Sequence, residues 1–86
     1  MNIEKEAASG SLQSNDCLVR VFPDNDLKIE IQSSVMKEFG HIIREVAEGM
    51  LKELKVQKGK VIIEDKGALD FTIRARIETA VKRSNE

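Results

Sequence analysis

The sequence contains no tryptophan or tyrosine, only three phenylalanines, one proline, one histidine and one cysteine in 86 residues. With so few aromatic rings, the core must be built from aliphatic side chains, and 41% of the residues are hydrophobic. A single cysteine cannot form a disulfide within the chain, which excludes a small secreted scaffold held by disulfides. No hydrophobic run approaches the roughly 20 residues of a membrane-spanning helix, and the first ten residues lack a signal-peptide core. We therefore expect a cytoplasmic protein with one small domain and no membrane contact.

An excess of positive charge is also missing. Fourteen lysines and arginines oppose fifteen aspartates and glutamates, for a formal net charge of -1. This balance argues against a general binder of nucleic-acid phosphates. Four basic residues near the end of the chain could still form a contact strip: Arg74, Arg76, Lys82 and Arg83. A small α+β module that binds protein or nucleic acid therefore remains an alternative.

Apolar residues alternate with polar ones in two stretches that predict strands. The first covers 17–22, the second covers 27–32, and the turn-forming Pro23-Asp24-Asn25-Asp26 lies between them. We expect these two strands to form an antiparallel hairpin. A third short strand is predicted at 60–64, where the chain reads KVIIE.

Apolar residues recur at helical spacing in two other stretches. The first, 35–54, predicts a long amphipathic helix with Ser33 or Ser34 as its N-cap. The second predicts a helix from about 69 to 82. The expected fold is α+β, a two-layer sandwich of order β-β-α-β-α, with a small, mostly antiparallel three-stranded sheet and both helices on one face. We expect a flexible segment at 1–15, one domain at 16–83 and a tail at 84–86.

The residues that could support catalysis have simpler structural interpretations. His41 lies on the charged face of the first helix without a second ligand at metal-binding spacing. Cys17 shares a strand face with Val19 and Val21, as a buried hydrophobe would. Asp65 and Asp70 flank a turn in DKGALD, where one can stabilise the turn and the other begin the second helix. No nucleophile–base pair, glycine-rich phosphate loop or metal set is present, which argues against a stand-alone enzyme.

A polar stretch, GSLQSND at 10–16, precedes the first predicted strand. It is either a frayed terminus or a place where a group is attached to a hydroxyl. Chemistry alone does not distinguish Ser14 from the other serines, which are Ser9, Ser11, Ser33, Ser34 and Ser84. A loop serine that bonds water or nearby backbone is the simpler interpretation of Ser14.

Four stretches resemble the acyl carrier subunit (gamma chain) of citrate lyase: AASGSLQSND, IQSSVMKEFG, VIIEDKGALD and FTIRARIETA. The resemblance runs from about Ala7 to Val81. Its most specific parts are the pattern G-[ST]-L-x-S-x-D and the later DKGALD…RARIE block. The acyl carrier subunits of malonate decarboxylase and citramalate lyase are close alternatives that differ in partners and substrate.

The resemblance implies a covalent prosthetic group on Ser14, namely 2'-(5''-phosphoribosyl)-3'-dephospho-CoA joined through a phosphodiester. The thiol of this arm would carry acetyl and citryl thioesters while citrate is cleaved to acetate and oxaloacetate. The implied partners are a transferase that attaches the group, the alpha subunit, which is an acyl transferase, and the beta subunit, which is a citryl lyase. The chain itself would be a carrier without catalytic activity.

Overall fold

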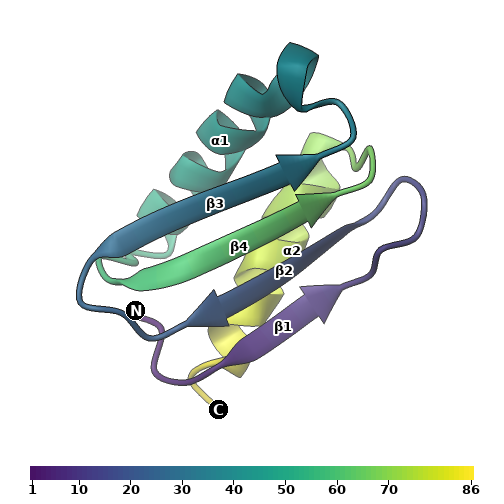
Figure 1. Cartoon of the computed structure of the whole chain (residues 1–86). Helices are drawn as coiled ribbons and strands as arrows, with labels where there is room; N and C mark the ends of the chain where they lie inside the picture. Colours follow the sequence, from purple (N-terminus) through teal and green to yellow (C-terminus); the bar gives the residue numbers. More distant parts are fainter.

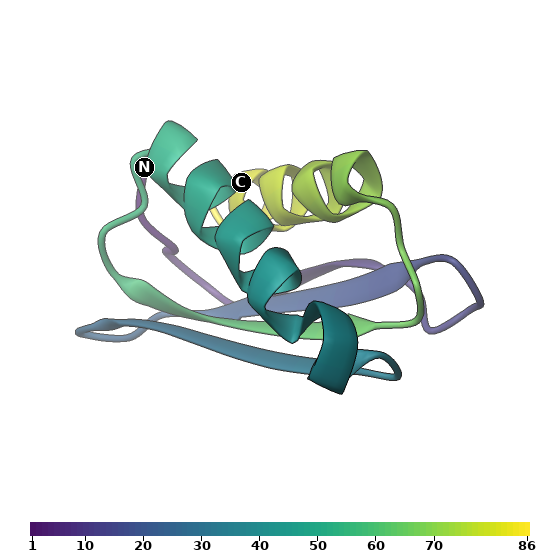
Figure 2. The ribbon, with the colours of Figure 1, turned by 90° about the horizontal axis from the view of Figure 1, so that it is seen from above.

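The computed structural model describes all 86 residues as a sheet with two helices packed on one of its faces (Figures 1 and 2). The elements are β1 (Ala7–Gly10), β2 (Cys17–Phe22), β3 (Leu27–Ser33), α1 (Met36–Glu53), β4 (Gly59–Asp65) and α2 (Asp70–Arg83). The expected α+β class and the placement of both helices on one face are confirmed.

The sheet has four strands in the order β1-β2-β4-β3, one strand more than expected. β2 pairs antiparallel with β1 and β4, whereas β3 and β4 run parallel. The predicted antiparallel hairpin between 17–22 and 27–32 is therefore wrong, because β4 inserts between β2 and β3. The reason lies in α1, which connects β3 to β4 as a crossover and makes them parallel neighbours.

Strict alternation of burial in β2 and β4 defines the core. Every second residue of each strand points toward the helices and is buried. Among them, the hydrophobic side chains are Cys17, Val19 and Val21 from β2, and Val61 and Ile63 from β4. α2 packs over β1 and β2, while α1 packs over β3. The core is almost entirely aliphatic, as the lack of aromatic residues predicts.

Residues 1–15 contain the strand that the sequence pattern did not reveal. β1 has only four residues, AASG, and these lack the β-branched side chains that predict strands. Earlier in the segment, the side chain of Ile3 is buried in the core against Gly59. At the other end of the chain, Ser84 is buried and donates a hydrogen bond to the carbonyl of Val81. Residues from both expected flanking segments thus take part in the packed structure.

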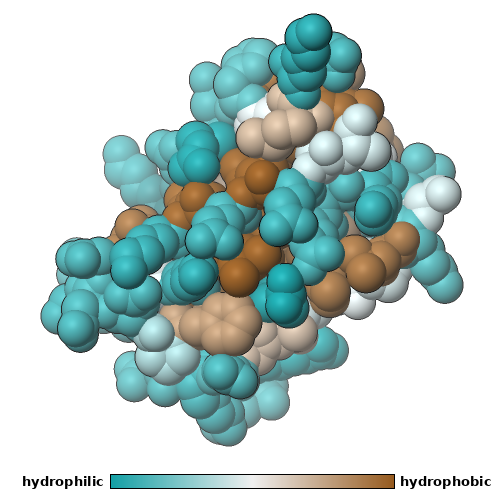
Figure 3. All heavy atoms as spheres, viewed as in Figure 1, coloured by the Kyte–Doolittle hydropathy of each residue, from teal (hydrophilic) through white to brown (hydrophobic).

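The outer face of the sheet carries apolar side chains among charged ones (Figure 3). Leu18, Phe22 and Ile62 are half-buried there. Two ion pairs cross neighbouring strands on this face, Arg20–Glu64 at 2.7 Å and Lys60–Glu30 at 3.4 Å. Neither helix has the length and apolar character needed to cross a lipid bilayer.

Candidate functional site

The loop that carries Ser14 connects β1 to β2 and lies at the end of the sheet where β4 leads into α2 (Figure 1). Ser14 is exposed, and its hydroxyl makes no hydrogen bond within the chain. The next residue, Asn15, has a φ of 66°, a left-handed conformation that asparagine tolerates better than most residues. The backbone therefore turns sharply directly after Ser14.

Asp16 fixes the end of this loop. Its carboxylate accepts hydrogen bonds from the Ser11 hydroxyl at 2.7 Å and from the backbone N–H of Cys17 at 2.7 Å. Arg76 of α2 donates two more, from Nε at 3.0 Å and Nη2 at 3.1 Å. The hydrogen bonds from Arg76 and Ser11 lower the pKa of Asp16 to about 2. The hydrogen bond to Asp16 in turn raises the pKa of Arg76. The loop is thus attached to α2 by a charge-assisted, two-point contact.

A second attachment joins the loop to the turn after β4. The N–H of Asn15 donates to the carbonyl of Lys66 at 2.8 Å, and the N–H of Lys66 donates to the carbonyl of Asp16 at 2.9 Å. The turn is itself held by Asp65, which accepts from the N–H groups of Gly67 and Ala68. Ser14 therefore lies on a loop whose C-terminal half is bonded to two other elements.

The N-terminal side of the loop depends on glycine. Gly10 has a φ of 97°, and a Cβ at this position would overlap the carbonyl oxygen of Cys17. That carbonyl also accepts a hydrogen bond from the N–H of Ser11 at 3.2 Å. Only glycine can bring the strands this close in this conformation.

Exposure and hydrogen bonding separate the six serines, which the sequence could not do without the resemblance. Ser9 and Ser84 are buried. The hydroxyls of Ser11 and Ser33 donate to Asp16 and Asp65. Ser14 and Ser34 remain as exposed serines whose hydroxyls have no partner in the chain.

The serines before α1 have a different role from the one expected. The N-cap of α1 is Val35, and no side chain caps the helix, so the predicted cap at Ser33 or Ser34 is wrong. The Ser33 hydroxyl instead accepts from the N–H of Val35 at 3.1 Å and donates to Asp65 at 2.9 Å. The hydroxyl therefore links β3 to the end of β4 and turns the chain toward α1.

The remaining candidates have structural surroundings. Cys17 is fully buried, and burial raises the pKa of its thiol to about 12. His41 is exposed on α1. Asp65 is buried and stabilises the turn, and Asp70 is exposed in the first turn of α2, so the structural interpretation of both is confirmed. No three His, Cys, Asp or Glu side chains lie close enough together to hold a metal ion.

The four basic residues of α2 all have partners within the chain. Arg74 pairs with Glu53 at 3.1 Å, Arg76 with Asp16, and Lys82 with Glu78 at 3.2 Å. Arg83 donates to the carbonyl of Ala8 at 2.9 Å. These contacts leave little of a basic strip for nucleic acid.

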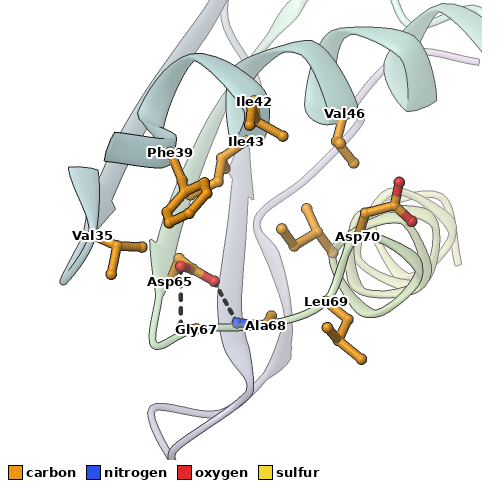
Figure 4. Close-up of a pocket in the computed structure, with 11 residues that line it drawn as sticks. Val35, Phe39, Ile42, Ile43, Val46, Asp65, Gly67, Ala68, Leu69 and Asp70 are labelled. Carbon is orange, nitrogen blue, oxygen red and sulfur yellow. Dashed lines mark hydrogen bonds between the residues drawn. The ribbon is translucent and has the colours of Figure 1, made fainter. Parts of the chain in front are cut away.

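A groove beside the loop was not foreseen from the sequence (Figure 4). It measures about 350 Å³ and lies between the N-terminal half of α1 and the segment that leads into α2. Apolar side chains, among them Phe39, Ile42 and Leu69, form most of its lining. Phe39 and Ile42 belong to the apolar stripe of α1, yet they are 51% and 42% exposed. The apolar stripe of α1 therefore includes residues that the core does not cover, and the width of the stripe was the available signal.

Fold and site together define a small α+β protein that presents an exposed hydroxyl on an anchored loop. Residues 4–84 match the family model described as malonate decarboxylase delta subunit (MdcD). The chain is 52% identical over 86 residues to the citrate lyase acyl carrier protein of Treponema denticola, covering 100% of this chain and 99% of that protein. It is 49% identical over 87 residues to the citrate lyase acyl carrier protein of Pectobacterium atrosepticum, covering 100% and 91%.

The fold also matches a chain in the crystal structure of a Pseudomonas malonate decarboxylase hetero-tetramer in complex with malonate. The TM-score is 0.83 with 23% identity, over 95% of this chain and 86% of that chain. At this identity the likeness concerns the fold. By its full-length relatives, the chain belongs to the family of citrate lyase acyl carrier proteins.

Proposed function

We propose that this chain carries acyl groups for citrate lyase on a prosthetic group attached to the hydroxyl of Ser14. The observation that carries the proposal is the combination of a free, exposed hydroxyl with an anchored loop. A transferase needs access to the hydroxyl, and a fixed loop presents it in one position. The other exposed and unpartnered serine, Ser34, lies outside the stretch that resembles the family's attachment pattern.

The residues around Ser14 fit a phosphodiester. The negative charge of Asp16, two residues away, is already compensated by Arg76. Lys66, whose backbone is bonded to Asn15, is exposed and adds a positive charge near the loop. Ser14 is itself exposed, so its hydroxyl is accessible.

The group proposed is 2'-(5''-phosphoribosyl)-3'-dephospho-CoA. When bound, it supplies a thiol at the end of a long arm, where acetyl and citryl groups are held as thioesters. The chain's own thiol cannot substitute for it, because Cys17 is buried and protonated. In this proposal the chain presents the arm, and the chemistry belongs to the alpha (acyl transferase) and beta (citryl lyase) subunits. Tethering raises the local concentration of the thioester at each partner.

Peptide mass spectrometry of protein isolated from cells that cleave citrate tests the attachment. We expect the adduct on the peptide that contains Ser14, and its loss in Ser14→Ala. The matched control is Ser34→Ala, which removes the other exposed hydroxyl and should leave the adduct in place. An adduct on Ser34, or an unmodified Ser14 while the lyase is active, would contradict the proposal.

The alternative substrate is malonate, since the family model and the solved structure both name malonate decarboxylase. Citrate lyase is favoured because the full-length relatives at 42–52% identity are its acyl carrier proteins. Reconstitution with the alpha and beta subunits should restore cleavage of citrate to acetate and oxaloacetate. Activity only with malonate decarboxylase subunits would select the alternative.

A further inference from the structure

The apolar groove beside the Ser14 loop is open to solvent and lined by large side chains. Phe39, Ile42 and Leu69 are 51%, 42% and 62% exposed, although each contributes to its walls. Small soluble domains seldom leave apolar side chains gathered at a concave surface unless something covers them. At about 350 Å³, the groove falls within the range of roughly 300–1,000 Å³ typical of small-molecule sites.

The groove begins where the Ser14 loop is attached. Lys66 exchanges two backbone hydrogen bonds with Asn15 and Asp16, at 2.8 and 2.9 Å. Its neighbours Asp65 and Gly67 line the groove, and the wall continues through Ala68 and Leu69 (Figure 4). The attachment point at Ser14 therefore lies close to the rim of the groove, and the far end of a long arm reaches the groove by folding back toward its base.

We propose that this groove is the resting site of the acetyl-thioester end of the arm; the proposal rests on attachment at Ser14. The occupant matches the lining: an acetyl methyl group, a sulfur, the ethylene of cysteamine and the paired methyl groups of pantothenate are all apolar. The tether makes tight binding unnecessary. With an effective concentration on the order of 1 mM, a dissociation constant near 1 mM is enough for half occupancy.

The charges around the groove select among acyl groups. Its charged lining residues are Asp65 and Asp70, and no lysine or arginine contributes to it. An acetyl thioester is neutral, whereas a citryl thioester keeps two carboxylates that Asp70 repels and that the apolar walls cannot solvate. The groove therefore holds the acetyl-loaded arm away from water and leaves the citryl-loaded arm free for the lyase partner.

The test measures how fast hydroxylamine removes acetyl from the loaded carrier, without partner subunits. Mass spectrometry first establishes the adduct on Ser14, and free acetyl-CoA gives the unprotected rate. We expect acetyl loss from the carrier to be at least about twofold slower than from acetyl-CoA, which is the protection that half occupancy of the groove gives. Leu69→Ser, in the exposed rim, should bring the rate close to that of acetyl-CoA, and it retains helix α2 because serine is a favoured N-cap.

The matched control is Leu27→Ser. Leu27 is also an exposed leucine, but it lies at the start of β3, and the groove is at the other end of that strand. This variant should protect acetyl as the wild type does. Amide NMR spectra supply a second readout: attachment of the acetylated arm should shift resonances of residues 39–46 and 67–70, and Leu69→Ser should reduce those shifts.

The outcomes separate the two proposals. A missing adduct on Ser14 overturns the proposed function, and the groove proposal with it. An adduct on Ser14 with acetyl loss as fast as from acetyl-CoA, and with no shifts at the groove, overturns only the groove proposal. Protection that survives Leu69→Ser places the resting site elsewhere. If the amide resonances of the groove shift only after the alpha or beta subunit is added, the groove is a docking surface for that partner, which also overturns the proposal.

Discussion

Arg76 in α2 and Asp16 at the end of the β1–β2 loop form a two-point ion pair, with N–O distances of 3.0 and 3.1 Å. Sixty residues separate them in the chain. Since Asp16 also bonds Ser11 and the backbone of Cys17, this pair connects both ends of the loop to the helix. The position of Ser14 is therefore set by a residue far away in the sequence.

Arg76→Ala should loosen the loop and lower the free energy of unfolding by about 1–2 kcal/mol, because Asp16 is half-buried and loses two charge-assisted hydrogen bonds. Urea unfolding measures the stability. The matched control is Arg74→Ala, which removes an exposed pair with Glu53 on the same helix and should cost at most about 0.5 kcal/mol.

The same variants test whether the pair positions Ser14. We expect Arg76→Ala to lower kcat for prosthetic-group attachment more than it raises KM, since the loop samples other conformations. Arg76→Lys keeps the charge but not the two-point geometry, and should restore only part of the rate. Equal attachment kinetics for Arg76→Ala and Arg74→Ala would assign the pair a purely structural role.

Acid should remove the contribution of the Asp16–Arg76 ion pair to the stability of the folded protein. The folded-state pKa of Asp16 is about 2, below its ordinary value of 3.8, so the folded protein binds this proton less readily than the unfolded chain does. The contribution is therefore complete above about pH 4 and is lost as the pH falls from about 4 through 2. The stability difference between wild type and Asp16→Asn should be constant from pH 7 to 5 and should shrink below pH 4. A difference that persists at pH 2 would show that the aspartate acts through shape and not through charge.

Two glycines give opposite predictions for the same substitution. Gly10→Ala places a Cβ against the Cys17 carbonyl at a φ of 97°, so we expect a loss of about 2–4 kcal/mol. Gly49 lies at an exposed position in the C-terminal half of α1, with nothing within 4 Å of the Cβ that Gly49→Ala adds. This substitution should stabilise the protein by about 0.5–1 kcal/mol. Thermal unfolding of both variants checks the two predictions. A Gly10→Ala variant as stable as the wild type would mean that the loop can rearrange.

Local patterns predicted those elements whose side chains carry a strong period. The alternation of β2 and β3 and the wide apolar stripe of α1 fall in this group. β1 was not predicted, because AASG has neither β-branched residues nor large apolar ones. It forms a strand because it pairs with β2 and packs against α2. The order of the strands in the sheet was not predicted for a related reason. Neighbours in a sheet are chosen by the crossover helix and by burial, which a pattern in one strand does not encode.

For the candidate site too, local patterns predicted some features, and others depend on the folded chain. Composition and spacing located a polar loop, and the resemblance selected Ser14 from six similar serines. The Asp16–Arg76 pair could not be predicted, because it joins residues that only the folded chain brings together. The groove was hidden because the apolar stripe of α1 reads as core-facing, whereas Phe39 and Ile42 are exposed and line the groove.

Asp65 and Asp70, the two aspartates of DKGALD, should differ sharply in their effects. Asp65 is buried and accepts from the Ser33 hydroxyl and from the N–H groups of Gly67 and Ala68, at 2.9, 3.1 and 2.9 Å. Asp65→Ala leaves these donors without a partner, so we expect a loss of about 2–4 kcal/mol in urea unfolding. Asp70→Ala removes only an exposed charge from the first turn of α2 and should cost about 0.5 kcal/mol.

Hydrogen exchange extends this prediction to the loop that carries Ser14. The N–H of Asn15 is bonded to the carbonyl of Lys66, the residue directly after Asp65. Asp65→Ala should therefore speed exchange at Asn15 by more than the global loss of stability accounts for, because the turn that holds the loop opens locally. In Asp70→Ala the exchange rate at Asn15 should match the wild type. Equal acceleration at Asn15 and in the centre of β4 would instead indicate that the loop opens only when the whole domain unfolds.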